Sequence, residues 1–181
     1  MKSASLRRSL HMATAAVLLL VPLGSWTVLR AVLLVGTALA VVLEMVRLRS
    51  FRLRNWMVRV APVFRPEEAG RPSGAMWLAV GYGIAALFPP PAPAMGILIG
   101  AIADPVASWA GSAGTATQGK TLRGSAGHFV IALGLLVPAG LPWGRAAVAA
   151  AVGTVLERWS GPLNDNVVVA PGVAAAVTLL V

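Results

Sequence analysis

Apolar stretches, separated by joints rich in Pro and Gly, run along almost the whole of this chain. They lie at about residues 10–25, 27–46, 73–90, 93–111, 125–141, 144–158 and 166–181. A helix needs roughly 20 apolar residues to cross the hydrocarbon of a bilayer, and several of these stretches are shorter. The pattern predicts an all-α, polytopic transmembrane bundle of about seven spans, the shorter of which end within the lipid interface.

The composition is typical of a membrane protein. Hydrophobic residues make up 57% of the chain and charged residues 12%, whereas a soluble domain carries about 25% charged residues. The chain has no cysteine, which excludes disulfides, thiolate zinc sites and thiol nucleophiles. With 181 residues, we expect a single integral membrane domain over residues 1–181.

Bases precede the first apolar stretch, as they do in a secretory signal. Lys2, Arg7 and Arg8 lie there, but no small-residue cleavage site follows, so we expect a retained first span with a cytoplasmic N-terminus. This orientation predicts cytoplasmic loops at about 47–72, 112–124 and 159–165.

The charged residues support that orientation. Thirteen of the fifteen Lys and Arg residues then lie on the cytoplasmic side, with Arg30 and Arg145 outside, as the positive-inside rule requires. All six acidic residues fall on the same side. The net charge of +9 is therefore explained by topology, and without a separate basic domain we expect no nucleic-acid partner.

Asp104 lies within the fourth apolar stretch, where an ionisable side chain is costly and by default a functional candidate. Gly96, Gly100, Asp104 and Ser108 recur at intervals of four residues and form one small, polar stripe on a helix. The two glycines are more simply a helix-packing face, within the chain or toward a second copy. Asp104 is not explained by packing.

A glycine-rich loop with two bases follows at residues 111–124. Its glycines allow backbone N–H groups to converge on an anion, and Lys120 and Arg123 add charge, so we predict a phosphate-binding loop. Residues 114–121 match GxxxxGK[ST], but a P-loop requires a preceding strand, and a transmembrane helix precedes this segment. A flexible basic loop is the simpler alternative. The nucleotide-binding candidates here are Gly111, Gly114, Gly119, Lys120, Thr121, Arg123 and Gly124.

Two further groups map to the same face. Glu157, Asn164, Asp165 and Asn166 offer oxygen ligands of the kind that Mg²⁺ prefers, although Asn-Asp-Asn is equally a helix cap. The basic group can clamp phosphate, although most arginines from 47 to 59 are more simply anchors for anionic lipid. Its members and their neighbours are Arg7, Arg8, His11, Glu44, Arg47, Arg65, Glu67 and Ser73.

The order of these groups resembles the CTP-dependent lipid kinase family, which includes dolichol kinase, phytol kinase and the yeast-type diacylglycerol kinase. The resemblance covers most of the chain and rests on several short motifs. They are Arg7-Arg8-x-x-His11, Glu44-x-x-Arg47, Arg65-x-Glu67 with Ser73-Gly74-Ala75, Asp104-Pro-Val-Ala107 with Gly111, Lys120-Thr-x-x-Gly124, and Glu157 with Asn164-Asp165-Asn166 and Pro171.

Two positions depart from the family pattern. Arg123 stands where the family often has an acid, and Asn164 stands where it often has Asp. CTP:phosphatidate cytidylyltransferases share an Asp and a Gly/Lys-rich loop of this kind, but their closing Ser-x-x-Lys-Arg and Lys-Asp signature is missing here. A non-catalytic membrane scaffold or small-solute transporter is the third alternative.

The resemblance implies transfer of the γ-phosphoryl group of CTP to a membrane alcohol such as a polyprenol, phytol-like alcohol or diacylglycerol, at the cytoplasmic interface. It implies Mg²⁺ held by Asp104, Asp165 and Glu157, with Lys120 neutralising phosphate charge and Arg7, Arg8 and Arg65 completing a clamp. Candidates for the catalytic base are Asp104, Asp165 and His11, in that order.

Overall fold

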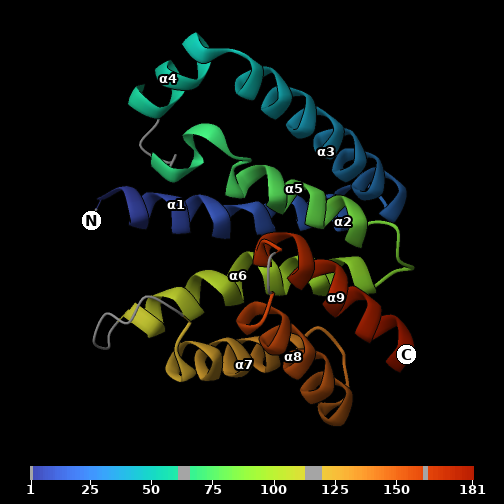
Figure 1. The fold of residues 1–181 in the computed structure, drawn as a ribbon. Helices are drawn as coiled ribbons and strands as arrows, with labels where there is room; N and C mark the ends of the chain where they lie inside the picture. Colours follow the sequence, from blue (N-terminus) through green and yellow to red (C-terminus); the bar gives the residue numbers. More distant parts are fainter. Residues whose placement is uncertain (1, 61–65, 113–119, 161–162) are drawn as a thin grey trace.

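The computed structural model describes residues 2–60, 66–112, 120–160 and 163–181, and every element in these ranges is helical (Figure 1). The predicted all-α class is confirmed. In chain order the helices are α1 Lys2–Ala13, the 3₁₀ helix η1 Thr14–Leu19, α2 Leu20–Leu23, α3 Trp26–Arg49, α4 Phe51–Val60, the 3₁₀ helix η2 Pro66–Gly70, α5 Gly74–Ala85, α6 Ala92–Ser112, α7 Leu122–Leu136, α8 Trp143–Arg158 and α9 Asp165–Leu180.

Each of the seven expected apolar stretches corresponds to a helix or a continuous helical run. In the described part of the chain, three are long and apolar enough to cross a membrane, namely Ser5–Leu23, Trp26–Arg49 and Ala92–Gly111. Shorter apolar helices lie at Gly74–Ala85, Leu122–Leu136 and Asp165–Leu180. The number of spans and the orientation of the N-terminus remain predictions.

The predicted cytoplasmic loops contain more helix than expected. Residues 47–49 complete α3, and α4 and η2 occupy much of the segment from 51 to 70. The loop expected at 112–124 ends earlier, because α7 begins at Leu122. In α4 the polar residues Arg52, Asn55 and Arg59 recur at intervals of three and four, which is helical periodicity that a search for long apolar spans does not register.

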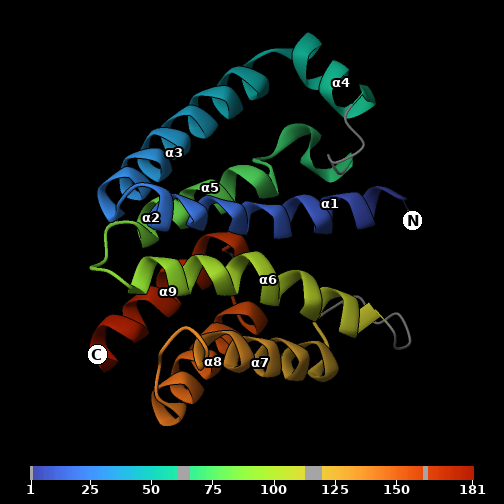
Figure 2. The same cartoon turned by 180° about the vertical axis from the view of Figure 1, so that it is seen from behind.

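The turns and helix termini gather at two ends of the bundle (Figure 1). One end carries the turns between α2 and α3, α5 and α6, and α7 and α8. The other, here called the polar end, carries the start of α1, the end of α3 and the start of α5, with the end of α6, the start of α7, the end of α8 and the start of α9. Seen from behind, α1 runs along α6 (Figure 2).

The core is built from small residues at helix crossings. Helix α9 packs against α5, α6 and α8, and a Cβ added to Gly96 of α6 would overlap the carbonyl oxygen of Ala170 in α9. The packing interpretation of Gly96 is thus confirmed. Because α6 and α9 approach so closely, Asp104 and Asp165 are held on neighbouring elements of a close-packed core.

One of the two bases expected outside has a local structural role. Arg30 donates from Nε to the Ala86 carbonyl oxygen at 2.8 Å and from Nη2 to that of Phe88 at 3.0 Å. Since these carbonyls follow the end of α5, they have no helical donor. Arg30 therefore satisfies the turn that leads into α6.

Candidate functional site

Side-chain caps fix three helix starts at the polar end. Ser73 Oγ accepts from the Met76 N–H, Thr121 Oγ1 from the Gly124 N–H, and Asn164 Oδ1 from the Asn166 N–H, at 3.2, 3.0 and 3.1 Å. The interpretation of Asn164 as a cap is confirmed. Asn166 Nδ2 also donates to the Gly74 carbonyl oxygen at 3.2 Å, so the starts of α9 and α5 are linked directly.

Lys120 forms ion pairs with two of the predicted acidic residues, Glu157 and Asp165. Its Nζ lies 2.9 Å from Glu157 Oε1 and 2.6 Å from Asp165 Oδ2, and it also donates to the Glu157 carbonyl oxygen. Burial lowers the pKa of Lys120, but Asp165 and Glu157 outweigh this and leave the pKa above its ordinary value of 10.5. The ammonium therefore stays charged at neutral pH and neutralises carboxylates from α8 and α9.

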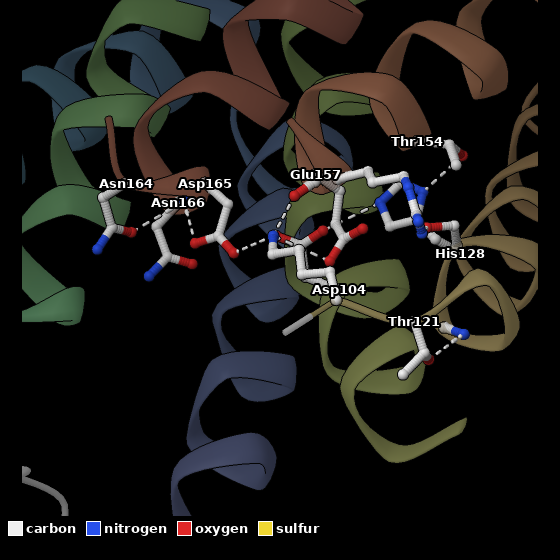
Figure 3. Close-up of polar contacts among 12 residues, drawn as sticks. Asp104, Thr121, His128, Thr154, Glu157, Asn164, Asp165 and Asn166 are labelled. Carbon is white, nitrogen blue, oxygen red and sulfur yellow. Dashed lines mark hydrogen bonds and ion pairs between the residues drawn. The ribbon is translucent and has the colours of Figure 1, made fainter. Parts of the chain in front are cut away.

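Asp104 lies deeper in the same region (Figure 3). Its Oδ1 is 3.0 Å from His128 Nε2. Its Oδ2 is buried without a hydrogen-bond partner among the described residues, and the same holds for Glu157 Oε2. Buried polar atoms are nearly always paired, so two orphaned carboxylate oxygens in one region point to a missing donor or cation.

The expected metal ligands do not form a ready-made metal site. No group of three His, Asp or Glu side chains in the described residues has a metal-binding arrangement. The Lys120 ammonium lies against both Glu157 and Asp165, which accounts for two of the three expected ligands. The orphaned oxygens of Asp104 and Glu157 nevertheless suit a hard cation such as Mg²⁺.

The glycine-rich loop is described only at its two ends. Gly114 and Gly119 lie outside the described residues. At the ends, a Cβ on Gly111 would come within 3.7 Å of the Gly124 Cα, so these glycines allow α6 and α7 to approach closely. The Gly124 N–H is already bonded to Thr121 and is not a free anion donor. Arg123 is exposed.

An open hollow borders Lys120. It has a volume of about 420 Å³ and is lined by Lys120, Arg158, Trp159 and Ser160. The Arg158 guanidinium lies 5.4 Å from the centre of the Trp159 ring and donates to Ser125 Oγ at 3.1 Å. Cationic, aromatic and hydroxyl side chains thus line one open depression at the polar end.

The N-terminal basic group reaches α6 through His11. Its Nε2 lies 3.0 Å from the Gly100 carbonyl oxygen, one helical turn before Asp104. Because a carbonyl only accepts, Nε2 carries the proton and Nδ1 is left as an acceptor. Arg7 and Arg8 are half-buried on α1, and Arg65 lies outside the described residues.

Glu44, Arg47 and Ser73 come together as a separate cluster. Arg47 binds both carboxylate oxygens of Glu44 at 2.8 and 2.9 Å and the carbonyl oxygens of Glu68 and Arg71 at 3.0 and 2.7 Å. The Ser73 N–H donates to Glu44 Oε1 at 2.5 Å. With Arg47 only 1% exposed, the lipid-anchor interpretation of most arginines from 47 to 59 does not apply to Arg47. The Glu67 side chain lies outside the described residues.

Two site residues were not predicted from the sequence. His128 is fully buried and bridges Asp104 to Thr154, with Nδ1 3.0 Å from Thr154 Oγ1. The rule that singled out Asp104, an ionisable residue within an apolar stretch, applies equally to His128. Nothing in the sequence distinguishes Thr154 from other threonines in apolar helices.

No family profile matches the chain, and searches of curated proteins and of solved structures find no match either. The interpretation of this site therefore rests on its own geometry and on the motif resemblance.

Proposed function

We propose that this protein is a membrane lipid-alcohol kinase that transfers the γ-phosphoryl group of CTP to a polyprenol, phytol-like alcohol or diacylglycerol. The observations that carry the proposal are an orphaned oxygen on each of Asp104 and Glu157 and the Lys120 ammonium, which pairs with the other oxygen of Glu157. Anion-binding and cation-binding groups in one cluster are what a metal-nucleotide complex requires. The motif resemblance supplies the reaction and the choice of CTP.

The proposed topology has seven spans with the polar end in the cytoplasm. Its support is the positive-inside count and the position of Glu44, Glu157 and Asp165 at helix termini of that end. A soluble nucleotide enters from water, and the acceptor lies between helices with its hydroxyl at the interface.

Asp104 Oδ2 and Glu157 Oε2 are the atoms that would hold Mg²⁺. A bound Mg²⁺ would supply charge neutralisation at the triphosphate oxygens. Lys120 now lies against Glu157 and Asp165, so it must turn toward the phosphates when the nucleotide binds. Its flexible side chain and compact charge suit this movement.

Asp165 is the carboxylate best suited to take the proton. Its side chain is one-third exposed, at 33%, and its Oδ1 accepts from the Asn166 N–H at 2.9 Å, which fixes its orientation. In the reaction the acceptor O–H bond breaks, its oxygen bonds to the γ-phosphorus, and the bond from that phosphorus to the β,γ-bridging oxygen breaks. The proton passes to Asp165 and the electron pair leaves with CDP.

The test is a product analysis with the full chain in lipid nanodiscs. It is incubated with γ-labelled CTP, Mg²⁺ and either a lipid alcohol or phosphatidate, and lipid phosphate, CDP, CDP-lipid and pyrophosphate are measured. Labelled lipid phosphate with equimolar CDP supports the proposal. Asp104→Asn serves as the inactive variant, and Arg145→Ala, which removes an exposed base at the opposite end, is the matched control.

Two outcomes contradict the kinase. Pyrophosphate together with CDP-lipid establishes a cytidylyltransferase instead. No turnover with any nucleoside triphosphate, with equal nucleotide binding by wild type, Asp104→Asn and Lys120→Ala, rules out both enzymes and favours a membrane scaffold or transporter.

A further inference from the structure

Three side chains from three helices form a buried chain of hydrogen bonds that ends on Asp104 (Figure 3). Thr154 of α8 contacts His128 of α7 at 3.0 Å, and His128 contacts Asp104 of α6 at 3.0 Å. The His128 ring is 0% exposed. Because no solvent reaches the His128 ring, its nitrogens have only Thr154 and Asp104 as hydrogen-bond partners.

The donors and acceptors of this chain can be assigned from its end groups. An ionised carboxylate only accepts, so His128 Nε2 must donate to Asp104 Oδ1. At the other end, Thr154 Oγ1 donates its single proton to the Ala150 carbonyl oxygen at 2.8 Å. The Thr154 oxygen therefore faces His128 Nδ1 as an acceptor.

Gly153 leaves the space that the His128 ring occupies. A Cβ at Gly153 would lie 3.4 Å from His128 Cε1 and 2.9 Å from Val173 Cγ2. The second of these distances is shorter than packed carbons allow, so a larger residue would displace the neighbours of His128. The ring is therefore held by packing as well as by its two hydrogen bonds.

We infer that His128, oriented by Thr154, is a positioning residue that engages one oxygen of Asp104 and directs the other toward a divalent cation. If the hydrogen bonds served only to join the helices, we would expect both oxygens of Asp104 to be paired. Asp104 Oδ2 has no hydrogen-bond partner in the described residues. Partners of metal-binding side chains commonly act in this way. The inference deepens the proposed function and rests on its cation site.

Binding of Mn²⁺, a spectroscopic substitute for Mg²⁺, tests this without turnover. Free Mn²⁺ is measured by electron paramagnetic resonance during titration of the full chain in nanodiscs. We expect His128→Ala to weaken Mn²⁺ binding about 10- to 100-fold. His128→Gln keeps an N–H donor for Asp104 and should stay within about 3-fold of wild type, a rescue that helix packing alone does not predict.

Two substitutions of Thr154 provide a second test, in which the expected change in Mn²⁺ affinity is smaller. Thr154→Val keeps the side-chain shape but removes the hydroxyl, and we expect about a 5- to 10-fold loss of Mn²⁺ affinity. Thr154→Ser keeps the hydroxyl and should bind like wild type. Thermal melting of each variant, followed by circular dichroism, separates lost binding from lost folding. Should His128→Ala fail to fold, the Thr154 pair decides.

Wild-type affinity in Thr154→Val, or in folded His128→Ala, overturns the inference and leaves the kinase standing. Equal weakening by His128→Ala and His128→Gln also overturns it. Mn²⁺ binding that depends on His128, in a protein that transfers no phosphoryl group from CTP, overturns the proposed kinase and supports the positioning role. No Mn²⁺ binding by wild type overturns the inference together with the proposed metal ligands.

Discussion

Two acidic clusters lie at the polar end of the bundle, and they differ in how completely their hydrogen bonds are satisfied. In the first, both oxygens of Glu44 accept from Arg47, and one also accepts from the Ser73 N–H. In the second, Lys120 binds Glu157 and Asp165, but Glu157 Oε2 and Asp104 Oδ2 have no partner in the described residues.

The difference suits the first cluster to a structural role and the second to the ligand-binding role proposed above. A buried ion pair whose atoms are all engaged ties its elements together, here the end of α3, η2 and the start of α5. A buried carboxylate oxygen without a donor carries a desolvation cost that a bound ligand can offset. Variants in the first cluster should therefore change stability, and variants in the second should change binding and turnover.

The largest effect is expected for Asp104→Asn. Loss of one cation-binding oxygen should lower kcat for phosphoryl transfer about 10⁴-fold, equivalent to about 5 kcal/mol of transition-state stabilisation. Its melting temperature should stay close to that of wild type, because the substitution removes an incompletely paired charge. If Asp104→Asn instead lost much of its stability while its folded fraction kept normal turnover, the second cluster would be structural, like the first.

Next comes Arg47→Met in the structural cluster. It leaves the Glu44 carboxylate buried and two carbonyls without their donor, so we expect about 3–5 kcal/mol of destabilisation. Thermal unfolding in detergent measures this, and the exposed neighbour Arg49 provides the control variant Arg49→Met. The folded fraction of Arg47→Met should keep wild-type kcat, and a specific loss of kcat there would assign Arg47 to the reaction.

Lys120→Ala tests whether the lysine occupies the place of a cation. We expect turnover to fall about 100-fold because the phosphates lose their neutralising charge. Mn²⁺ binding should be at least as tight as in wild type, since Glu157 and Asp165 lose a competing ammonium. Weaker Mn²⁺ binding in Lys120→Ala, with Arg145→Ala unchanged, would show that Lys120 supports the cation and does not compete with it.

Gly96→Val probes how the second cluster depends on packing. The new side chain would meet the Ala170 carbonyl, and we expect about 1–3 kcal/mol of destabilisation and a shift of α9 away from α6. Gly134→Ala, at a position with no atom within 4 Å of an added Cβ, should not destabilise the protein. Turnover of folded Gly96→Val should fall as well, because Asp165 moves relative to Asp104.

The smallest effect is the pH dependence that Lys120 imparts. Its pKa is raised above 10.5 in the folded protein, so its stabilising contribution is complete below that pH and is lost as pH rises through the folded value. The difference in melting temperature between wild type and Lys120→Ala should stay constant from about pH 7 to pH 9 and shrink at higher pH. A difference that disappears below pH 9 would contradict the raised pKa.

The helical fold was predictable because apolar periodicity and Pro/Gly joints are local features of the sequence. Asp104 and Glu157 were also recognisable as candidates, since charge is rare in apolar stretches. Lys120 and Asp165 were recognisable from the glycine-rich loop and the Asn-Asp-Asn segment in which they lie. What these side chains contact was not predictable. Whether Arg47 reaches lipid or Glu44 depends on how η2 folds back over the end of α3, and the distance between Asp104 and His128 is set by the crossing of α6 and α7.

Helix α9 follows α5, α6 and α8 in the chain yet packs against all three. During synthesis those helices are made before the segment that completes their packing and supplies Asp165. Until α9 is made, Lys120 lacks one of its two carboxylate partners. The packing of three helices and the pairing of Lys120 therefore both depend on α9, so a chain truncated before α9 would lose both together.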